Sequence, residues 1–175
     1  MKNLIRHILK ESNKSKFIDL VISKIKSNNF KPPYFKKLRD FELSDKDIKL
    51  ILSKVLGKYV EADPHNYNSV YDDSGDMIYY EDSDGYWEKW ERNEKGKIVY
   101  HTTVNNYWEK NKYDESGNEI YHEDSTGYWI KRWYDEKGNF IYFEDSDGNW
   151  NRMEYNEIGH LIYRENAKGV ILDRR

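Results

Sequence analysis

An internal repeat with a period of 21 residues constrains this chain more than any other feature. Five copies, numbered 1 to 5 here, follow one another without a gap at residues 71–91, 92–112, 113–133, 134–154 and 155–175. Every copy has a glycine at its fifth position and a tyrosine at its ninth, preceded by Ile or Val. The glycines are Gly75, Gly96, Gly117, Gly138 and Gly159, and the tyrosines are Tyr79, Tyr100, Tyr121, Tyr142 and Tyr163. Such a period predicts a repeat architecture in which each copy is one supersecondary unit.

Each copy contains two four-residue turn segments, and nearly all of them begin with Asp or Asn and end with Gly. The first set is Asp72–Gly75, Asn93–Gly96, Asp114–Gly117, Asp135–Gly138 and Asn156–Gly159. The second set is Asp82–Gly85, Asp124–Gly127, Asp145–Gly148 and Asn166–Gly169, with Thr103–Asn106 as the exception. This pattern is typical of type I turns that end on a left-handed residue, and Asn adopts that conformation next most readily after Gly. We therefore expect a positive φ at the five glycines of the first set and at Asn106.

The runs between the turns are rich in Ile, Tyr, Trp and Phe, which favour strands. Turns every 10 or 11 residues predict about eleven short strands in an up-and-down order, with no helix longer than one turn in residues 71–175. Residues 59–70 are interpreted as a degenerate leading copy, with residues 66–71 as the first strand. The fold class is α+β: a small N-terminal helical cap followed by an antiparallel meander sheet of five 21-residue β-hairpin repeats.

The odd period raises a question about the two faces of this sheet. Side chains alternate between the two faces along a strand. With an odd period, equivalent residues of successive copies share a face only if one residue of each copy falls outside this alternation. We expect the two turns of each copy to differ in loop parity. Aromatic residues occupy both phases of the second strand, as at Tyr86 and Trp87. The sheet is therefore either a single layer coated on both faces or a rolled sheet.

The charge of the chain changes sharply near residue 58. Residues 1–58 contain 15 Lys and Arg and 6 Asp and Glu, a net charge of +9, whereas residues 59–175 carry −12. We expect two parts, a basic helical segment at 1–58 and an acidic, aromatic-rich repeat domain at 59–175.

Apolar spacing predicts the helices of the basic segment. Leu4, Ile5, Ile8 and Leu9 indicate a first helix, residues 15–27 a second, and residues 34–38 a short third. The last helix begins after Ser44, an N-cap residue, and ends at Gly57. Its apolar stripe is expected to face the N-terminal end of the sheet near Tyr59, Tyr67 and Tyr71, as a cap of the kind that repeat arrays require. The stripe consists of Ile48, Ile51, Leu52 and Val55.

Several functional classes are excluded or disfavoured by the residues present. The chain has no cysteine, no apolar run near the roughly 20 residues of a membrane-spanning helix, and no nucleophile elbow, P-loop or dinucleotide motif. Acidic tips such as Glu81–Gly85 lack calcium-loop spacing, because position 1 would be Tyr80, His122 or Phe143. We expect no enzyme activity, no cofactor and no metal site.

Because the opening residues are charged, we expect no secretory signal and a cytoplasmic protein, in the host cell or in the virion if it comes from a phage.

Two tandem-hairpin families share these motifs. The segments Tyr71–Gly75, Tyr113–Gly117 and Tyr134–Gly138 resemble the Tyr-Asp-x-x-Gly signature of the YD repeat of Rhs-type proteins. The segments Gly85–Trp87 and Gly127–Trp129 are similar to the Gly-x-Trp of MORN-like variant repeats. Both resemblances are limited to residues 71–175, and neither implies catalysis. The opening, from Asn3 to Glu11, resembles the start of uncharacterised tailed-phage proteins.

A regular array of hairpins presents a long surface, which is the usual purpose of a repeat array. We expect a non-enzymatic protein–protein interaction scaffold, in the form of a phage-encoded accessory or inhibitor protein. The alternatives are a carbohydrate-binding module that uses the Trp and Tyr ladder, and a structural virion or assembly component.

Nucleic acid is not expected as a partner, because the lysines of the basic segment are spread over all faces. Self-association is expected, if anywhere, at the C-terminal edge strand. The candidate binding surface consists of Trp87, Trp108, Trp129, Trp150, Tyr86, Tyr107, Tyr128, Lys89, Lys110 and Lys131.

Overall fold

The computed structural model describes residues 14–27, 31–41, 43–62 and 68–175. The helix expected over Leu4–Leu9 and the residue Tyr67 lie outside this part of the chain. The chain divides into two compact units, residues 1–90 (unit 1) and 91–175 (unit 2). The boundary expected near residue 58 rests on composition and stays a prediction.

Unit 1 combines helices with the first strands. Its helices are α2 (Lys14–Ser27), α3 (Tyr34–Arg39) and α4 (Asp45–Leu56). Its strands are β1 (Tyr59–Glu61), β2 (Asn68–Tyr71), β3 (Met77–Glu81) and most of β4 (Trp87–Arg92), whose last two residues belong to unit 2. Each strand pairs antiparallel with the next along the chain.

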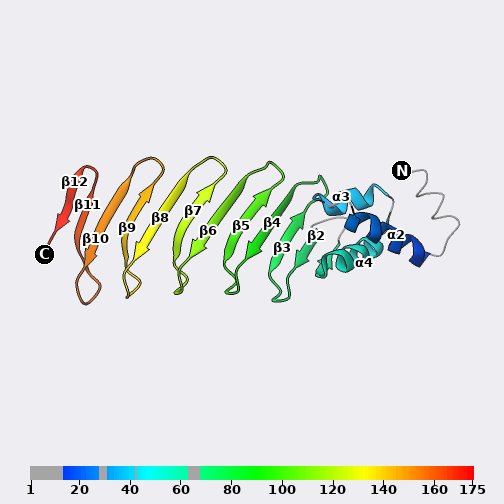
Figure 1. Ribbon diagram of the computed structural model, residues 1–175, viewed down its shortest axis with the longest axis horizontal. Coiled ribbons are helices and arrows are strands. Elements are labelled where there is room, and N and C mark those ends of the chain that lie inside the picture. Colours follow the sequence, from blue (N-terminus) through cyan, green and yellow to red (C-terminus); the bar gives the residue numbers. More distant parts are fainter. Residues whose placement is uncertain (1–13, 28–30, 42, 63–67) are drawn as a thin grey trace. The chain divides into compact units, whose positions relative to one another are not determined.

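Unit 2 is an antiparallel meander. Its strands, labelled in Figure 1, are β5 (Ile98–Thr103), β6 (Trp108–Tyr113), β7 (Glu119–Asp124), β8 (Trp129–Tyr134), β9 (Phe140–Asp145), β10 (Trp150–Tyr155), β11 (Leu161–Asn166) and β12 (Gly169–Asp173). The α+β class and the meander of hairpins are confirmed. The described residues form twelve strands rather than about eleven, because Tyr59–Glu61 adds a short strand ahead of Asn68–Tyr71.

Both kinds of turn share one backbone geometry. In the Asp135–Gly138 turn, the Asp135 N–H donates to the Asn139 carbonyl at 2.9 Å, and the Gly138 N–H donates to the Asp135 carbonyl at 2.9 Å. The Asp145–Gly148 turn repeats these bonds at 3.0 and 3.1 Å. The φ of Asn106 is 61°, and the predicted glycines all have positive φ, so the turn assignment is confirmed. The expectation that the two turns differ in loop parity is wrong.

A β-bulge, rather than a longer turn, corrects the odd period. Tyr134 lies opposite Phe140 and Trp133 opposite Tyr142, so Ile141 is an extra residue without a partner on β8. The same shift leaves out Ile78, Ile120 and Ile162 in three other copies. A bulge places two residues opposite one and so absorbs one residue without changing the phase of the strand. The residue before the invariant tyrosine therefore keeps equivalent side chains of these copies on one face.

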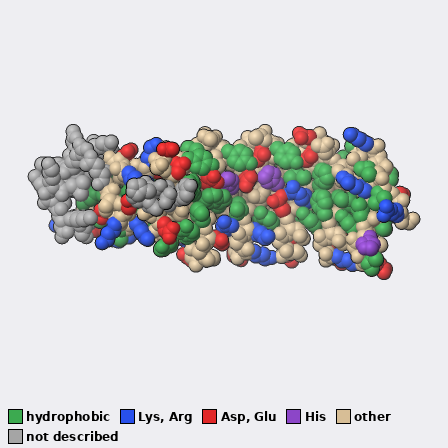
Figure 2. All heavy atoms as spheres, turned by 180° about the vertical axis from the view of Figure 1, so that it is seen from behind, with side chains coloured by type: hydrophobic (Ala, Val, Ile, Leu, Met, Phe, Trp, Pro, Cys, Tyr) green, Lys and Arg blue, Asp and Glu red, His purple; other side chains and the backbone are tan. Residues whose placement is uncertain are grey.

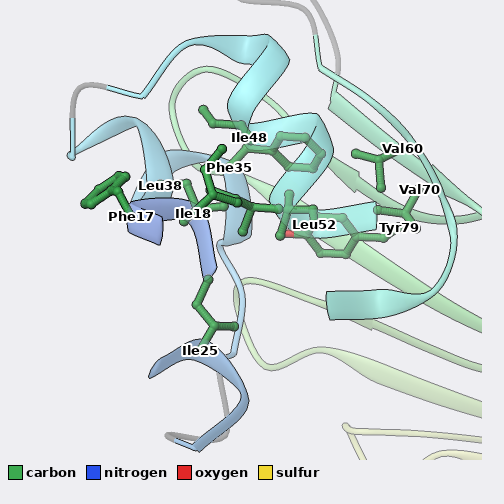
Figure 3. Packing of buried hydrophobic residues seen from close by; sticks show 11 residues of the cluster. Phe17, Ile18, Ile25, Phe35, Leu38, Ile48, Leu52, Val60, Val70 and Tyr79 are labelled. Atoms are coloured by element: carbon green, nitrogen blue, oxygen red, sulfur yellow. The ribbon is translucent and has the colours of Figure 1, made fainter. Parts of the chain in front are cut away.

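The hydrophobic core lies in unit 1, where the helices pack on one face of the first strands. Of the predicted apolar stripe, Ile48, Ile51 and Leu52 of α4 are fully buried in one cluster with Val60 of β1 and Val70 of β2, and Val55 is partly buried against that cluster. Phe17 and Ile18 of α2, Phe35 and Leu38 of α3, and Tyr79 of β3 complete the centre of this cluster (Figure 3). Tyr59, expected at this contact, is 55% exposed instead, because neighbouring residues of β1 point to opposite faces and Val60 makes the contact.

The ends of α4 follow their sequence signals. The Ser44 hydroxyl accepts a hydrogen bond from the Asp47 N–H at 3.3 Å, and Gly57 ends the helix with a φ of 65°. Ser44 is thus the N-cap that satisfies a free N–H group, and Gly57 supplies the left-handed C-cap.

Unit 2 is a single-layered sheet with aromatic residues on both faces. Its eight strands pair only in chain order. Its buried side chains are Thr103, Asn111, Asp145, Asn151 and Tyr163, and most of its aromatic side chains are half-buried. The rolled alternative is therefore wrong for unit 2, and cross-strand pairs, rather than a second layer, cover its apolar surface.

Candidate functional site

One face of unit 2 carries a repeated row of four side chains, which we call the ladder face. Its register places Tyr121 of β7 opposite Lys131 of β8, Lys131 opposite Glu144 of β9, and Glu144 opposite Trp150 of β10. The preceding row, two strands earlier, consists of Tyr100, Lys110, Glu123 and Trp129. The ladder face thus presents aromatic, basic and acidic side chains in a fixed order.

Cations lie over the tryptophan rings of this face. The Lys110 Nζ is 4.5 Å from the centroid of the Trp108 ring, and the Lys131 Nζ is 4.7 Å from that of Trp129. The Lys131 Nζ also lies 3.0 Å from the Glu144 Oε1 in an exposed ion pair. Each of these lysines is two residues after its tryptophan, so both side chains point to the same face.

The opposite face of unit 2, the reverse face, has a different composition. Tyr107 packs against His101 with centroids 6.3 Å apart, and Tyr128 packs against His122 at 6.4 Å. The His122 Nδ1 lies 2.8 Å from the Asn111 Oδ1. Figure 2 shows that hydrophobic and charged side chains lie interspersed on the face of the molecule that it presents.

The candidate surface derived from the sequence therefore does not lie on one face. In unit 2 the structure places Trp108, Trp129, Trp150, Lys110 and Lys131 together on the ladder face, and Tyr107 and Tyr128 on the reverse face. Unit 1 shows the same division. Trp87 stacks on Tyr79 and Lys89 lies opposite Tyr79, whereas Tyr86 packs against Tyr80. A hydrogen bond to Glu88 raises the pKa of Tyr86 to about 12.

The residues of the Tyr-Asp-x-x-Gly signature have structural roles. In copies 3 and 4 the hydroxyl of the signature tyrosine donates to a carbonyl 15 residues earlier: Tyr113 to Ile98 at 3.0 Å and Tyr134 to Glu119 at 3.2 Å. The Tyr71 hydroxyl of copy 1 donates to the Glu61 carboxylate instead. The aspartate that follows accepts bonds from the turn itself, and the Asp135 Oδ1 accepts from the N–H groups of Lys137 and Asn139. In copies 3 and 4 the signature thus ties its strand to the preceding strand and closes the turn that follows.

The acidic tips bind their own backbone. The Asp145 Oδ1 accepts from the N–H groups of Asp147 and Asn149 at 3.0 and 2.9 Å. A hydrogen bond from Thr126 lowers the pKa of Asp124. Within the described part of the chain, no cluster of three or more metal-ligating side chains occurs. Among the same residues, no helix combines the length and apolar character needed to span a membrane.

The structure also reveals a polar site that the sequence analysis missed, at the start of α3. Glu81 is fully buried, and its two carboxylate oxygens accept from the N–H groups of Phe35 at 2.9 Å and Lys36 at 2.6 Å. The Tyr79 hydroxyl donates to the same carboxylate at 2.7 Å. The available signal was the recurrence of Tyr-x-Glu, which appears again at Tyr121–Glu123, Tyr142–Glu144 and Tyr163–Glu165.

Comparisons with known proteins return structures only. No protein-family model matches the chain, and no curated protein matches it. A crystal structure of TcdB2-TccC3-TEV is 18% identical, with a TM-score of 0.49, over 58% of this chain and 5% of that chain. Structures of TcdB2-TccC3-Cdc42 and TcdB2-TccC3 are also 18% identical, with TM-scores of 0.48 and 0.47, over 57% and 58% of this chain.

The chain corresponds to about 5–6% of the length of those similar chains. At this level of likeness the comparison carries no argument about this chain. The β-hairpin repeat is established here by the strand pairing itself.

Proposed function

We propose that the protein is a non-enzymatic scaffold that binds another protein through the ladder face of unit 2. The observation that carries this proposal is the row of Tyr121, Lys131, Glu144 and Trp150, which is preceded by an equivalent row two strands earlier. Aromatic side chains are the usual anchors of protein interfaces, and alternating charges set register and steer association. The role in a phage, as an accessory or inhibitor protein acting in the host cytoplasm, belongs to the same proposal.

The geometry of the tryptophans favours a protein over a sugar. Stacking on a sugar requires an open aromatic ring, but Lys110 and Lys131 each cover a ring of this face. Trp150 stacks on Tyr142 with centroids 6.4 Å apart. When a partner protein binds, one of its own cationic side chains can replace the lysine over such a ring.

Charge reversal on the ladder face tests the proposal. A tagged chain carrying Lys110→Glu, Lys131→Glu and Arg152→Glu would be purified from the cells that produce it, and the co-purifying proteins quantified by mass spectrometry. We expect a discrete set of partners to fall at least about tenfold relative to the unmodified chain, while the melting transition is retained. The matched control carries Lys95→Glu, Lys137→Glu and Lys168→Glu at the turns of the same unit, and it should keep those partners.

Two outcomes would contradict the proposal. Equal loss in both variants would mean that the partners bind to overall charge rather than to this face. Specific, saturable binding to a glycan array that survives the ladder-face variant, without any protein partner, would favour the carbohydrate alternative.

A further inference from the structure

The start of α3 is held by Tyr79 and Glu81 of copy 1. These two residues and their cross-strand partners form a set of four side chains that we call a quartet: Tyr79, Glu81, Trp87 and Lys89. In this quartet Tyr79 lies opposite Lys89, and Glu81 lies opposite Trp87. Two consecutive backbone N–H groups, of Phe35 and Lys36, donate to the Glu81 carboxylate. Burial of a carboxylate is costly unless its hydrogen bonds are satisfied, and here three donors satisfy it.

Aromatic contacts complete this recognition. The Tyr34 ring lies 4.7 Å from that of Tyr79, and the Phe35 ring lies 6.4 Å from it on a near-parallel plane. The Tyr79 ring also stacks on the Trp87 ring, with centroids 6.4 Å apart and an angle of 22° between the ring planes. Copy 1 thus binds a segment that offers two free N–H groups beside aromatic side chains.

The same quartet recurs in unit 2, on the ladder face. In copy 3 it consists of Tyr121, Glu123, Trp129 and Lys131, and in copy 4 of Tyr142, Glu144, Trp150 and Arg152. Their cross-strand partners match those of copy 1: tyrosine lies opposite the cation, and glutamate opposite tryptophan. Copy 2 has Thr102 in place of the glutamate, and copy 5 has Ile171 in place of the tryptophan.

The quartet of copy 4 reproduces the ring geometry of the occupied quartet. Tyr142 and Trp150 have centroids 6.4 Å apart with planes at 26°, close to the 6.4 Å and 22° of Tyr79 and Trp87. The Glu144 side chain is 37% exposed and is paired with Lys131, which is 45% exposed. An exposed ion pair of this kind contributes little free energy, so an incoming donor can displace it.

We infer that the quartets of copies 3 and 4 are binding sites for a partner segment built like the start of α3. The ligand is a segment of another protein that presents two consecutive free backbone N–H groups, as at the beginning of a helix, next to an aromatic side chain. Its N–H groups bind the glutamate. Its ring packs on the tyrosine, where it displaces the Lys112 Nζ that lies 5.3 Å from the Tyr121 centroid, or packs beside the Trp133 ring that lies 5.1 Å from that of Tyr142. This inference rests on the proposed function, because it names the chemistry that the ladder face recognises.

A peptide copied from the chain itself is the probe. It contains residues 31–41, is extended at its C-terminus with alanine, glutamate and lysine to favour a helix, and carries a fluorescent label. Titrated against the full-length chain and followed by anisotropy, it should bind with two sites per chain. Glu123→Gln combined with Glu144→Gln should weaken this binding at least about tenfold, because hydrogen bonds to a charged acceptor are stronger than those to a neutral one.

A matched variant controls for simple charge attraction. Glu136→Gln combined with Glu157→Gln removes the same two charges at exposed turn positions of unit 2 and should leave binding unchanged. A second peptide, N-methylated at the residues that correspond to Phe35 and Lys36, lacks the two donors and should bind at least about tenfold more weakly.

The outcomes separate this inference from the proposed function. The inference is overturned if the peptide does not bind, if both glutamine variants bind it equally, or if N-methylation has no effect. In each of those cases the proposed function still stands when ladder-face charge reversal removes the cellular partners. Concentration-dependent dimerisation that the peptide inhibits would support the inference and identify a second copy of this chain as a source of the ligand.

Discussion

At the scale of single residues, Glu81 is the side chain whose loss we expect to lower the free energy of unfolding most. Replacing it by alanine leaves the N–H groups of Phe35 and Lys36 and the Tyr79 hydroxyl without their acceptor in a buried site. We expect Glu81→Ala to lower the free energy of unfolding by about 3 kcal/mol or more, measured by urea denaturation.

The equivalent glutamate of copy 5 provides the control. Glu165 accepts a hydrogen bond from the Tyr163 hydroxyl but does not contact α3. Glu165→Ala should therefore lower the free energy of unfolding by less than about 1 kcal/mol. Equal losses in the two variants would show that the contact with α3 is not what makes Glu81 important.

Tyr79 makes the stability of unit 1 sensitive to alkaline pH. Burial and, next, the neighbouring Glu81 carboxylate raise the pKa of Tyr79 well above its usual value of 10.0. Above about pH 10 the unfolded chain loses this proton while the folded chain keeps it. The free energy of unfolding should therefore fall as pH rises above 10, by up to about 1.4 kcal/mol per pH unit for this group.

A Tyr79→Phe variant tests that dependence. It should be less stable than the wild type at pH 8, because a hydrogen bond to Glu81 is lost, but its stability should decline less steeply between pH 10 and 11. Parallel declines in urea titrations at several pH values would rule out Tyr79 as a source of the effect.

At the scale of elements, the bulge determines which side chains share a face. Because Ile141 has no partner on β8, its deletion leaves the pairs of Trp133 with Tyr142 and of Tyr134 with Phe140 in place. Deletion of Phe143 instead shifts Tyr142 to the other face and breaks its stack on Trp150. We expect the Phe143 deletion to be less stable than the Ile141 deletion by about 1 kcal/mol or more, measured by urea denaturation. A larger cost for losing Ile141 would contradict the bulge as the device that sets the phase.

The elements also show how much of the fold the sequence could predict. Turns and the caps of α4 depend on local chemistry, so the Asp/Asn-to-Gly segments located the turns, and Ser44 and Gly57 located the ends of α4. The prediction that the two turns of each copy differ in loop parity was wrong. The odd period is corrected by a bulge instead, and a bulge depends on how two strands pair. Its only sequence signal is the Ile or Val before each invariant tyrosine, which also fits an ordinary strand residue.

The candidate site was predicted in part for the same reason. The period located the tryptophans and lysines, but the face of each residue depends on the bulge, so Tyr107 and Tyr128 were grouped with them although they lie on the reverse face. The role of Glu81 depends on α3, which is 45 residues away in the chain. The recurring Tyr-x-Glu pattern marks this residue, but it does not reveal the contact with α3.

At the scale of the whole molecule, the two units differ in how they bury apolar surface. Unit 1 has a helical core over β1–β3, whereas unit 2 depends on pairs between half-buried side chains of one sheet. Deleting residues 1–57 would expose Val60, Val70 and Tyr79 and remove both backbone donors to Glu81. We expect this fragment to aggregate or to lose its cooperative melting transition, measured by light scattering and circular dichroism. A monomeric, cooperatively melting fragment would show that the helices are an independent module.

The central claim is that a partner protein covers the ladder face and leaves the reverse face open. The chain has no cysteine, so single cysteines can report on each face without interference. They would be placed at Lys131 and Arg152 on the ladder face, and at Ile130 and Arg164 on the reverse face, and maleimide alkylation rates would be compared in buffer and in extract of the producing cells. The account predicts slower alkylation in extract at Lys131 and Arg152 alone. Protection at Ile130 and Arg164, or at none of the four positions, would contradict it.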